Sequence, residues 1–197
     1  GVSSPAMSLE RLGDHGLRWV WPEIPVAHPL DGGRAGVLRR SVDDTAEGLG
    51  VDGPAWKRLF DPLVRNWSKL LPQLLGPVVS VPRHPVAMAR FGIHAVQPAT
   101  WVTKRFETEE AAALFGGCAA HAILPLTRPL TAAFGMMLAG SAHADGWPVA
   151  GGGSQAVADR HLSFQPIPTV QGDRVQVRQG LVVGLQQELL VGLKDQL

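Results

Sequence analysis

Histidine, cysteine and serine are the residue types in this chain that most often carry out chemistry. The seven histidines include no His-Glu-x-x-His motif and no pair four residues apart, the spacing that places two imidazoles on one helix face around a metal. We therefore predict no metal site. Cys118 lies in an apolar segment that would raise the pKa of its thiol, so we do not expect a nucleophile. No serine lies in a Gly-x-Ser-x-Gly motif, and the catalytic residues stay unknown.

A run of glycines, Gly151 to Gly153, precedes a predicted helix start at Gln155. A glycine loop that opens a helix can direct amide N–H groups toward an anion, or let a flat ligand lie against bare backbone. The run is neither the Gly-x-Gly-x-x-Gly of a dinucleotide site nor a P-loop. A simple turn and a ligand-binding turn both stay open.

Small residues gather in two apolar segments, residues 116–120 and residues 135–140. Small side chains on a helix allow a neighbouring backbone to approach closely, and Met136 and Met137 can fill irregular gaps. One interpretation is a helix pair that forms the wall of an apolar ligand channel. The other is ordinary core packing, which the residue types alone favour.

The chain up to about residue 40 predicts short strands. Segments 17–21, 24–28 and 34–39 have the composition or the alternation of strands, and Asp31-Gly32-Gly33 is a turn signal between the last two. Pro25 favours an edge position for the second strand. Three short strands joined by tight turns predict an antiparallel meander over residues 17–39.

From Ser41 onward the apolar residues recur with the period of helices. Ser41 and Thr108 can each cap a helix, and Pro54 can open one that Pro62 is expected to kink or divide. The predicted helices cover residues 41–48, 54–71, 86–91, 99–103, 111–122 and 129–144. The fold class predicted is therefore α+β, helix-rich, with a small antiparallel sheet.

The pattern changes after Asp159. Residues 160–169 are predicted as a loop, residues 174–178 as a strand that joins the sheet, and residues 181–193 as a terminal helix. We therefore divide the chain into residues 1–159 and a divergent tail, residues 160–197.

Composition narrows the function classes. A hydrophobic fraction of 45% supports a folded core, and 18 basic against 17 acidic residues give no electrostatic case for nucleic-acid binding. One cysteine excludes an internal disulfide and suits a reducing compartment. Residues 111–126 form the longest uncharged run, which is too short to span a membrane. We expect a cytoplasmic protein, with peripheral membrane contact as a further expectation.

Several short segments occur in an informative order. They are Ser4-Pro5-Ala6, His15-Gly16-Leu17-Arg18-Trp19, residues 27–33, residues 81–85, Arg90-Phe91-Gly92, Phe106 with Thr108-Glu109, and Gly146-Trp147-Pro148-Val149 followed by Gly152-Gly153-Ser154-Gln155. In this order they resemble the FAD-dependent phytoene desaturase-like oxidoreductases, which are relatives of the flavin amine oxidases. The resemblance covers residues 4–159.

The resemblance implies a fold with a Rossmann-type FAD domain and a substrate domain, of which this chain resembles the substrate domain. The family's glycine fingerprint, which holds the pyrophosphate of FAD, does not occur in this sequence. We therefore expect a partial chain whose partner is the missing FAD-domain segment. A diverged end, a frameshifted reading or a truncated product would each explain why the resemblance ends near Asp159.

The resemblance also implies site residues. Gly152 and Gly153 match a glycine pair that lies near the flavin in the family, and His28 and Trp147 are candidate residues lining the substrate. The cofactor implied is FAD, which accepts a hydride from a lipophilic substrate.

Two functions follow as hypotheses. The first is a fragment of an FAD-dependent oxidoreductase, inactive as an isolated chain. The second is a redox-inactive module that binds an apolar ligand or a partner, because the nucleotide fingerprint is missing. A non-functional truncated product is a third.

Overall fold

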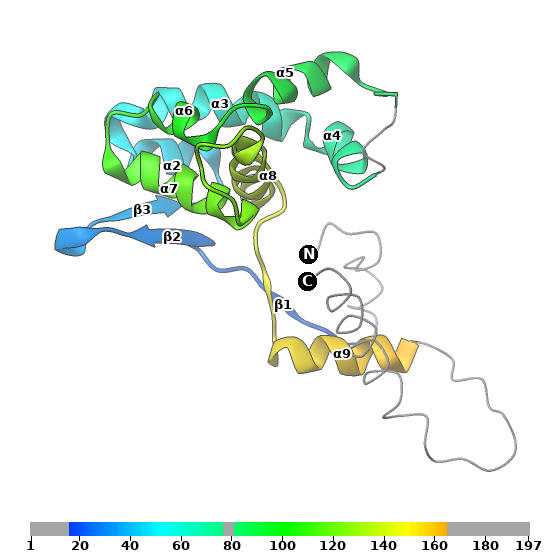
Figure 1. Cartoon of the computed structure of the whole chain (residues 1–197). Coiled ribbons are helices and arrows are strands. Elements are labelled where there is room, and N and C mark those ends of the chain that lie inside the picture. The colour runs from blue at the N-terminus through cyan, green and yellow to red at the C-terminus, as the bar shows by residue number, and fades with distance from the viewer. Residues whose placement is uncertain (1–15, 77–80, 165–197) are drawn as a thin grey trace, which may run out of the picture. The chain divides into compact units, whose positions relative to one another are not determined.

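Helices dominate the part of the chain that the structure, a computed structural model, describes: residues 16–76 and 81–164 (Figure 1). Antiparallel strand pairs accompany them, so the α+β, helix-rich fold class predicted from the sequence is confirmed. The strands are β1 (Trp19–Val20), β2 (Val26–Pro29), β3 (Ala35–Leu38) and β4 (Val149–Ala150). The helices are α2 (Val42–Gly48), α3 (Gly53–Arg65), α4 (Trp67–Leu74), α5 (Pro85–Ala95), α6 (Ala99–Thr103), α7 (Glu109–Ala119), α8 (Thr131–Ala144) and α9 (Gly153–Phe164), with short 3-10 turns at Asp31–Gly33, Gly50–Asp52 and Ala120–Ala122.

The predicted three-stranded meander is wrong in its pairing. β2 and β3 form one antiparallel hairpin, with Val26 opposite Leu38, whereas β1 pairs with β4 from the far end of the described chain. Pro22 and Pro25 stand between β1 and β2, and a proline has no N–H to donate to a ladder. The indole of Trp21 instead donates to the carbonyl of Asp145 (3.3 Å), at the end of α8.

The β2–β3 hairpin packs on α7 through glycines (Figure 1). A Cβ at Gly36 of β3 would overlap the backbone carbonyl of Glu110, so the strand crosses the start of α7 at backbone distance. Beside this crossing, the Arg34 guanidinium donates to Glu109 and Glu110. Because these ion pairs are largely exposed, they contribute little, and the close approach fixes the position of the hairpin.

The start of α7 is also held by a buried carboxylate. Asp52 is 1% exposed and accepts hydrogen bonds from the backbone N–H of Glu107 (2.8 Å), the backbone N–H of Thr108 (2.8 Å) and the Thr108 hydroxyl (2.5 Å). Burial alone would raise the pKa of Asp52, but these three donors outweigh it and the pKa is lowered. The carboxylate therefore joins the start of α3 to the segment that leads into α7.

The predicted helix caps are confirmed. The Ser41 hydroxyl accepts from the backbone N–H of Asp44 (3.1 Å), and the Thr108 hydroxyl accepts from that of Ala111 (3.3 Å). Pro62, in contrast, does not divide its helix, because α3 continues to Arg65 and the break comes at Asn66. The Asn66 side chain donates to the carbonyl of Pro62 (2.9 Å), which satisfies one of the carbonyls at the end of α3.

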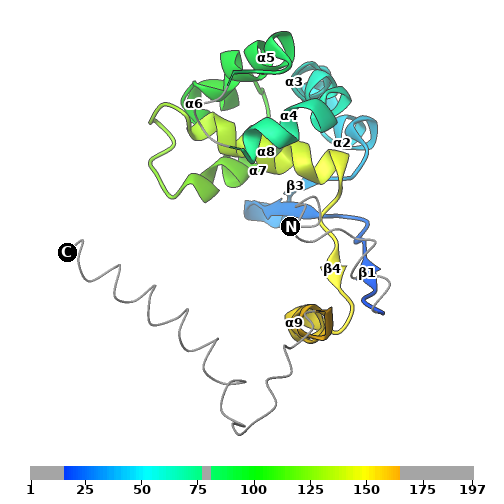
Figure 2. The same cartoon turned by 90° about the vertical axis from the view of Figure 1, so that its right-hand side faces the viewer.

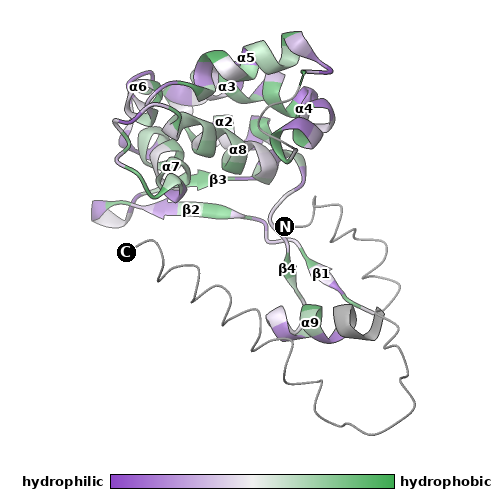
Figure 3. Cartoon of the chain, turned by 45° about the vertical axis from the view of Figure 1, so that its right-hand side comes forward, coloured by the Kyte–Doolittle hydropathy of each residue, from purple (hydrophilic) through white to green (hydrophobic). Residues whose placement is uncertain are grey.

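The small residues of α8 make room for neighbouring side chains. A Cβ at Gly135 would lie 2.8 Å from the Phe115 ring of α7, and a Cβ at Gly140 would lie 2.8 Å from Leu63 of α3. Figure 2 shows α8 beneath α3, α4 and α5 and next to α7, and Figure 3 shows hydrophobic residues along β3 and in the helices around it. At these positions core packing, one of the two interpretations of the small residues, is what the structure has.

One buried histidine lies at the centre of this core. His143 is 4% exposed; the Trp56 indole N–H donates to its Nε2 (3.1 Å), and its Nδ1 lies 3.1 Å from the carbonyl of Arg40. An indole N–H can only donate, so Nε2 accepts and the proton is assigned to Nδ1, which donates to the carbonyl. Burial lowers the pKa of His143, and it outweighs the backbone hydrogen bonds and the charge of Asp61, which raise it.

The end of the described chain differs from the sequence expectation. Residues 160–164 were predicted as loop, but α9 continues through Asp159 to Phe164. The first proline after the glycine run and Gln155 is Pro166, so no proline interrupts this helix. The strand predicted at 174–178, the helix predicted at 181–193 and most of the tail 160–197 lie outside the described residues.

We expect the stability of the fold to decrease below about pH 6.5, the ordinary pKa of an unfolded histidine. Because the pKa of His143 is lowered in the folded state, the unfolded chain takes up the proton first, and stability that is complete above that pH is lost as the pH decreases. Urea unfolding at about pH 7.5 and about pH 5 measures the difference.

His143→Gln keeps one acceptor and one donor, so it should reduce this pH dependence. His84→Gln is the control, because His84 is exposed and makes no side-chain hydrogen bond to a described residue. A His143→Gln variant with the full wild-type pH dependence would contradict this role.

Candidate functional site

The glycine run forms the predicted turn at the start of a helix. Gly152 (φ +91°) and Gly153 (φ +77°) both have left-handed backbone, which favours glycine, and Gly153 is the first residue of α9. The N–H of Gly151 donates to the carbonyl of Arg18 (2.7 Å), which ties the turn to β1. Both glycines are exposed, and a Cβ at Gly153 would meet open space. The turn therefore offers bare backbone that a flat ligand can approach.

His28, the second candidate, lies on β2 with its ring directly over α7. A Cβ at Gly117 would overlap the imidazole, so the ring lies against bare helix backbone. Its Nε2 is buried and has no hydrogen-bond partner among the described residues. Burial lowers the pKa of His28, and the nearby His121 lowers it further. His28 is thus a neutral ring with an unpaired nitrogen at the hairpin–α7 junction.

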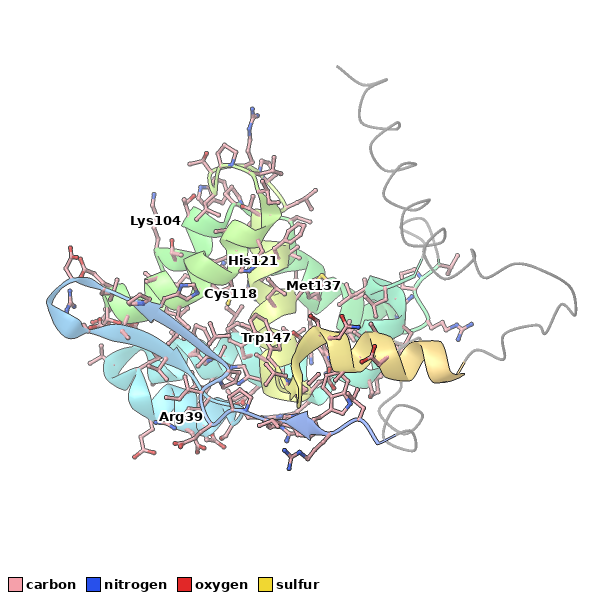
Figure 4. All side chains as sticks on the ribbon, turned by 90° about the horizontal axis from the view of Figure 1, so that it is seen from below. Arg39, Lys104, Cys118, His121, Met137 and Trp147 are labelled. Atoms are coloured by element: carbon pink, nitrogen blue, oxygen red, sulfur yellow. The ribbon has the colours of Figure 1, made fainter. Side chains whose placement is uncertain are left out.

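Trp147, the third candidate, follows α8 and is half-buried against the core. Its indole N–H donates to the Ser141 hydroxyl (2.9 Å), which itself donates to the carbonyl of Leu138 (2.8 Å). The polar edge of the ring is therefore fully occupied, and what remains available to a ligand is an aromatic face. Figure 4 labels Trp147, which follows the end of α8, and Met137, which lies within that helix.

The structure does not bring the three candidates into contact. His28 is held by α7, Trp147 by α8, and the Gly152–Gly153 turn by β1, and no hydrogen bond or ring contact joins them in the described part of the chain. They belong to separate parts of one surface or to separate surfaces. A site that uses all of them needs a ligand large enough to span them.

The pKa of the Cys118 thiol is raised, as its apolar segment predicts. Cys118 is 1% exposed on α7, and burial raises its pKa to about 11, so little thiolate exists near neutral pH. Among residues 16–76 and 81–164, no group of three or more histidine, cysteine and acidic side chains could hold a metal ion. No helix in those ranges is long and apolar enough to cross a membrane.

Sequence reasoning missed a cationic pocket on the face made by α3 and α5. Its cavity is about 230 Å³, and Arg58, Arg90 and His94 are among the residues that line it. Arg90 and His94 are four residues apart on α5, which places them on one helix face. The spacing of Arg90 and His94 is present in the sequence, but only the fold shows that Arg58 of α3 lines the same pocket.

Comparisons with known proteins give this chain no relative. No protein-family model, no curated protein and no solved structure matches it significantly. Its candidate sites therefore have to be assigned from its own residues.

We expect Gly117→Ala to destabilise the fold by about 1–3 kcal/mol, because the new methyl group would overlap the ring of His28. Gly116→Ala is a matched control on the same helix: its Cβ would lie 3.8 Å from Thr103, an ordinary contact, so better helix propensity should stabilise by up to about 1 kcal/mol. Urea unfolding measures both.

The double variant His28→Ala with Gly117→Ala tests the cause directly. Removing the imidazole should recover most of the loss, giving a coupling energy of about 1 kcal/mol or more. Equal effects of the two glycine substitutions would contradict the packing of His28 on α7.

Proposed function

We propose that this chain is the substrate-binding part of an FAD-dependent oxidoreductase of the phytoene desaturase-like kind. In this role it places a lipophilic substrate beside a flavin for hydride transfer. The observation that carries the proposal is the ordered set of motifs over residues 4–159, which ends in the Gly152–Gly153 pair. Its support from the fold is that both glycines have left-handed backbone and are exposed.

The chain's own residues would bind and orient rather than transfer protons. A flavin accepts a hydride, so the protein supplies placement and exclusion of water. Gly152 and Gly153 would lie against the flavin, while His28 and Trp147 would line the substrate. A neutral imidazole and an aromatic face both suit an apolar ligand, because binding against them removes no charged group from water. The pyrophosphate of FAD would be held by a nucleotide-binding segment outside this sequence.

A second function is a redox-inactive module that binds an apolar ligand. It is favoured by the lack of a nucleotide fingerprint in the sequence and by a pocket whose floor consists of buried apolar side chains. The two functions differ in one measurable property, which is whether the protein holds flavin.

Peripheral contact of a cytoplasmic protein with a membrane is part of the proposal, and the loop between α7 and α8 supports it. Ile123 is 91% exposed, Leu130 is 59% exposed and Leu124 is 54% exposed. Ile123 (φ +54°) and Leu130 (φ +70°) also have left-handed backbone, which is costly for side chains with a Cβ and rare for a β-branched residue. Strained backbone that exposes apolar side chains suits insertion into a lipid surface.

The flavin assignment is tested by two matched glycine variants. Gly153→Ala and Gly32→Ala introduce a methyl group at nearly the same backbone angle (φ +77° and +73°), and neither methyl group meets an atom within 4 Å. The backbone strain should therefore be alike, about 1–2 kcal/mol. In protein expressed from the complete reading frame, only Gly153→Ala should lower the bound flavin per chain or the rate of flavin reduction.

Equal flavin content and equal reduction rates in the two variants would contradict contact between this turn and the flavin. Thermal unfolding of both variants confirms that their strain is comparable.

Membrane contact is tested by sedimentation with vesicles of phosphatidylcholine and phosphatidylglycerol. Replacing Ile123 and Leu124 by serine should weaken binding at least about ten-fold, because each buried aliphatic side chain contributes about 1.5–3 kcal/mol. Val51→Ser is the control, since Val51 is 66% exposed on a different loop. Wild-type protein that stays in the supernatant would contradict this contact.

A further inference from the structure

The face made by α3 and α5 holds two adjoining pockets that the proposed flavin and substrate residues do not line. The first, of about 230 Å³, is lined by residues of α3, α4, α5 and α8. Figure 2 labels these four helices. Its floor is made of buried apolar side chains: Leu59, Leu63, Leu70, Phe91 and Met136. A floor of this kind favours an alkyl chain over a polar ligand.

Two guanidinium groups border this apolar floor. Arg58 comes from α3 and Arg90 from α5, and both side chains line the pocket. Neither has a hydrogen bond or an ion pair with any residue in 16–76 or 81–164. A guanidinium carries five N–H donors in a planar fork that matches a carboxylate or a phosphate. Two such forks on one pocket leave donors available for an anionic head group.

The second pocket, of about 270 Å³, continues from the first. Arg58, Leu59 and His94 line both, and the second extends to Arg105 and Phe106. The Arg105 guanidinium lies 2.9 Å from Nδ1 of His94 and donates to Oε1 of Gln97 (2.9 Å). Because arginine only donates, Nδ1 of His94 accepts, which places the ring proton on Nε2. Burial, and after it the charge of Arg105, lower the pKa of His94, and the hydrogen bond from Arg105 orients the ring where the two pockets join.

The described residues that line the two pockets carry charge of one sign. None of these described residues is acidic, and three of them are arginines. The half-buried acid of α3, Asp61, lies 3.4 Å from Lys57 and 3.6 Å from Arg65 and does not line either pocket. A cleft lined by positive charge over an apolar floor attracts anions.

We propose that these adjoining pockets bind a single-chain amphiphile with an anionic head group. Its alkyl chain lies on Leu59, Leu63 and Phe91, and its carboxylate or phosphate lies between Arg58 and Arg90. This site uses none of Gly152, Gly153, His28 and Trp147, so it does not depend on the proposed flavin chemistry. It gives the chain a place for a charged lipid-like molecule as well as for a neutral lipophilic substrate.

Calorimetric titration of the full chain tests the site with four probes below their micellar concentrations. Octanoate and octyl phosphate carry both an alkyl chain and an anionic head, octanol carries the chain alone, and acetate carries the head alone. We expect octanoate or octyl phosphate to bind at least about ten-fold more tightly than octanol and acetate. The stronger of the two identifies the head group.

Arg58→Gln and Arg90→Gln should each weaken that binding at least about ten-fold. Arg65→Gln is the control, because Arg65 lies two turns farther along α3 and lines neither pocket. Thermal unfolding should be unchanged, since neither pocket arginine forms an ion pair with a described residue. Absence of binding by both anionic probes, equal binding of octanol, or an equal effect of Arg65→Gln would each overturn the proposal.

Discussion

The fold depends on backbone approaching backbone where the β2–β3 hairpin crosses α7. Gly36 allows β3 to pass over the carbonyl of Glu110, and Gly117 allows the ring of His28 to lie on the helix. Each glycine comes from a different partner in the contact, so the hairpin is fixed at both ends of α7. Asp52 also fixes the start of the same helix, because its carboxylate accepts from the backbone N–H groups of Glu107 and Thr108, which precede α7. The position of His28, one of the candidate site residues, follows from this junction.

Local signals in the sequence predicted the elements well. Ser41 and Thr108 are caps because a hydroxyl before a helix satisfies a backbone N–H that the helix leaves unpaired. The α+β class followed from the change in apolar period at Ser41. Strand pairing did not, because it is a long-range property: nothing near Trp19 indicates that its partner is Ala150. The full length of α9 was not predicted, because residues 160–164 carry no strong helix signal and Pro166 follows them closely.

The candidate site was predictable only where backbone conformation is encoded by residue type. Glycines at 152 and 153 indicated a turn, and the structure has that turn with left-handed backbone. The packing of His28 on Gly117 involves residues far apart in the chain, and no local pattern reveals it. The same is true of Arg58 and Arg90, which belong to different helices and share a pocket only in the folded chain. The proposed flavin and substrate residues, Gly152, Gly153, His28 and Trp147, do not line the cationic pocket, so the proposed substrate surface and this pocket are two distinct features of the fold.

The central claim is that this chain works beside a flavin, and the visible absorption spectrum of the purified protein tests it most directly. Protein expressed from the complete reading frame that contains this sequence should be yellow, with flavin bands that bleach on reduction and FAD released on denaturation. A colourless protein that releases no flavin, purified from the same reading frame and folded by its thermal transition, would contradict the claim.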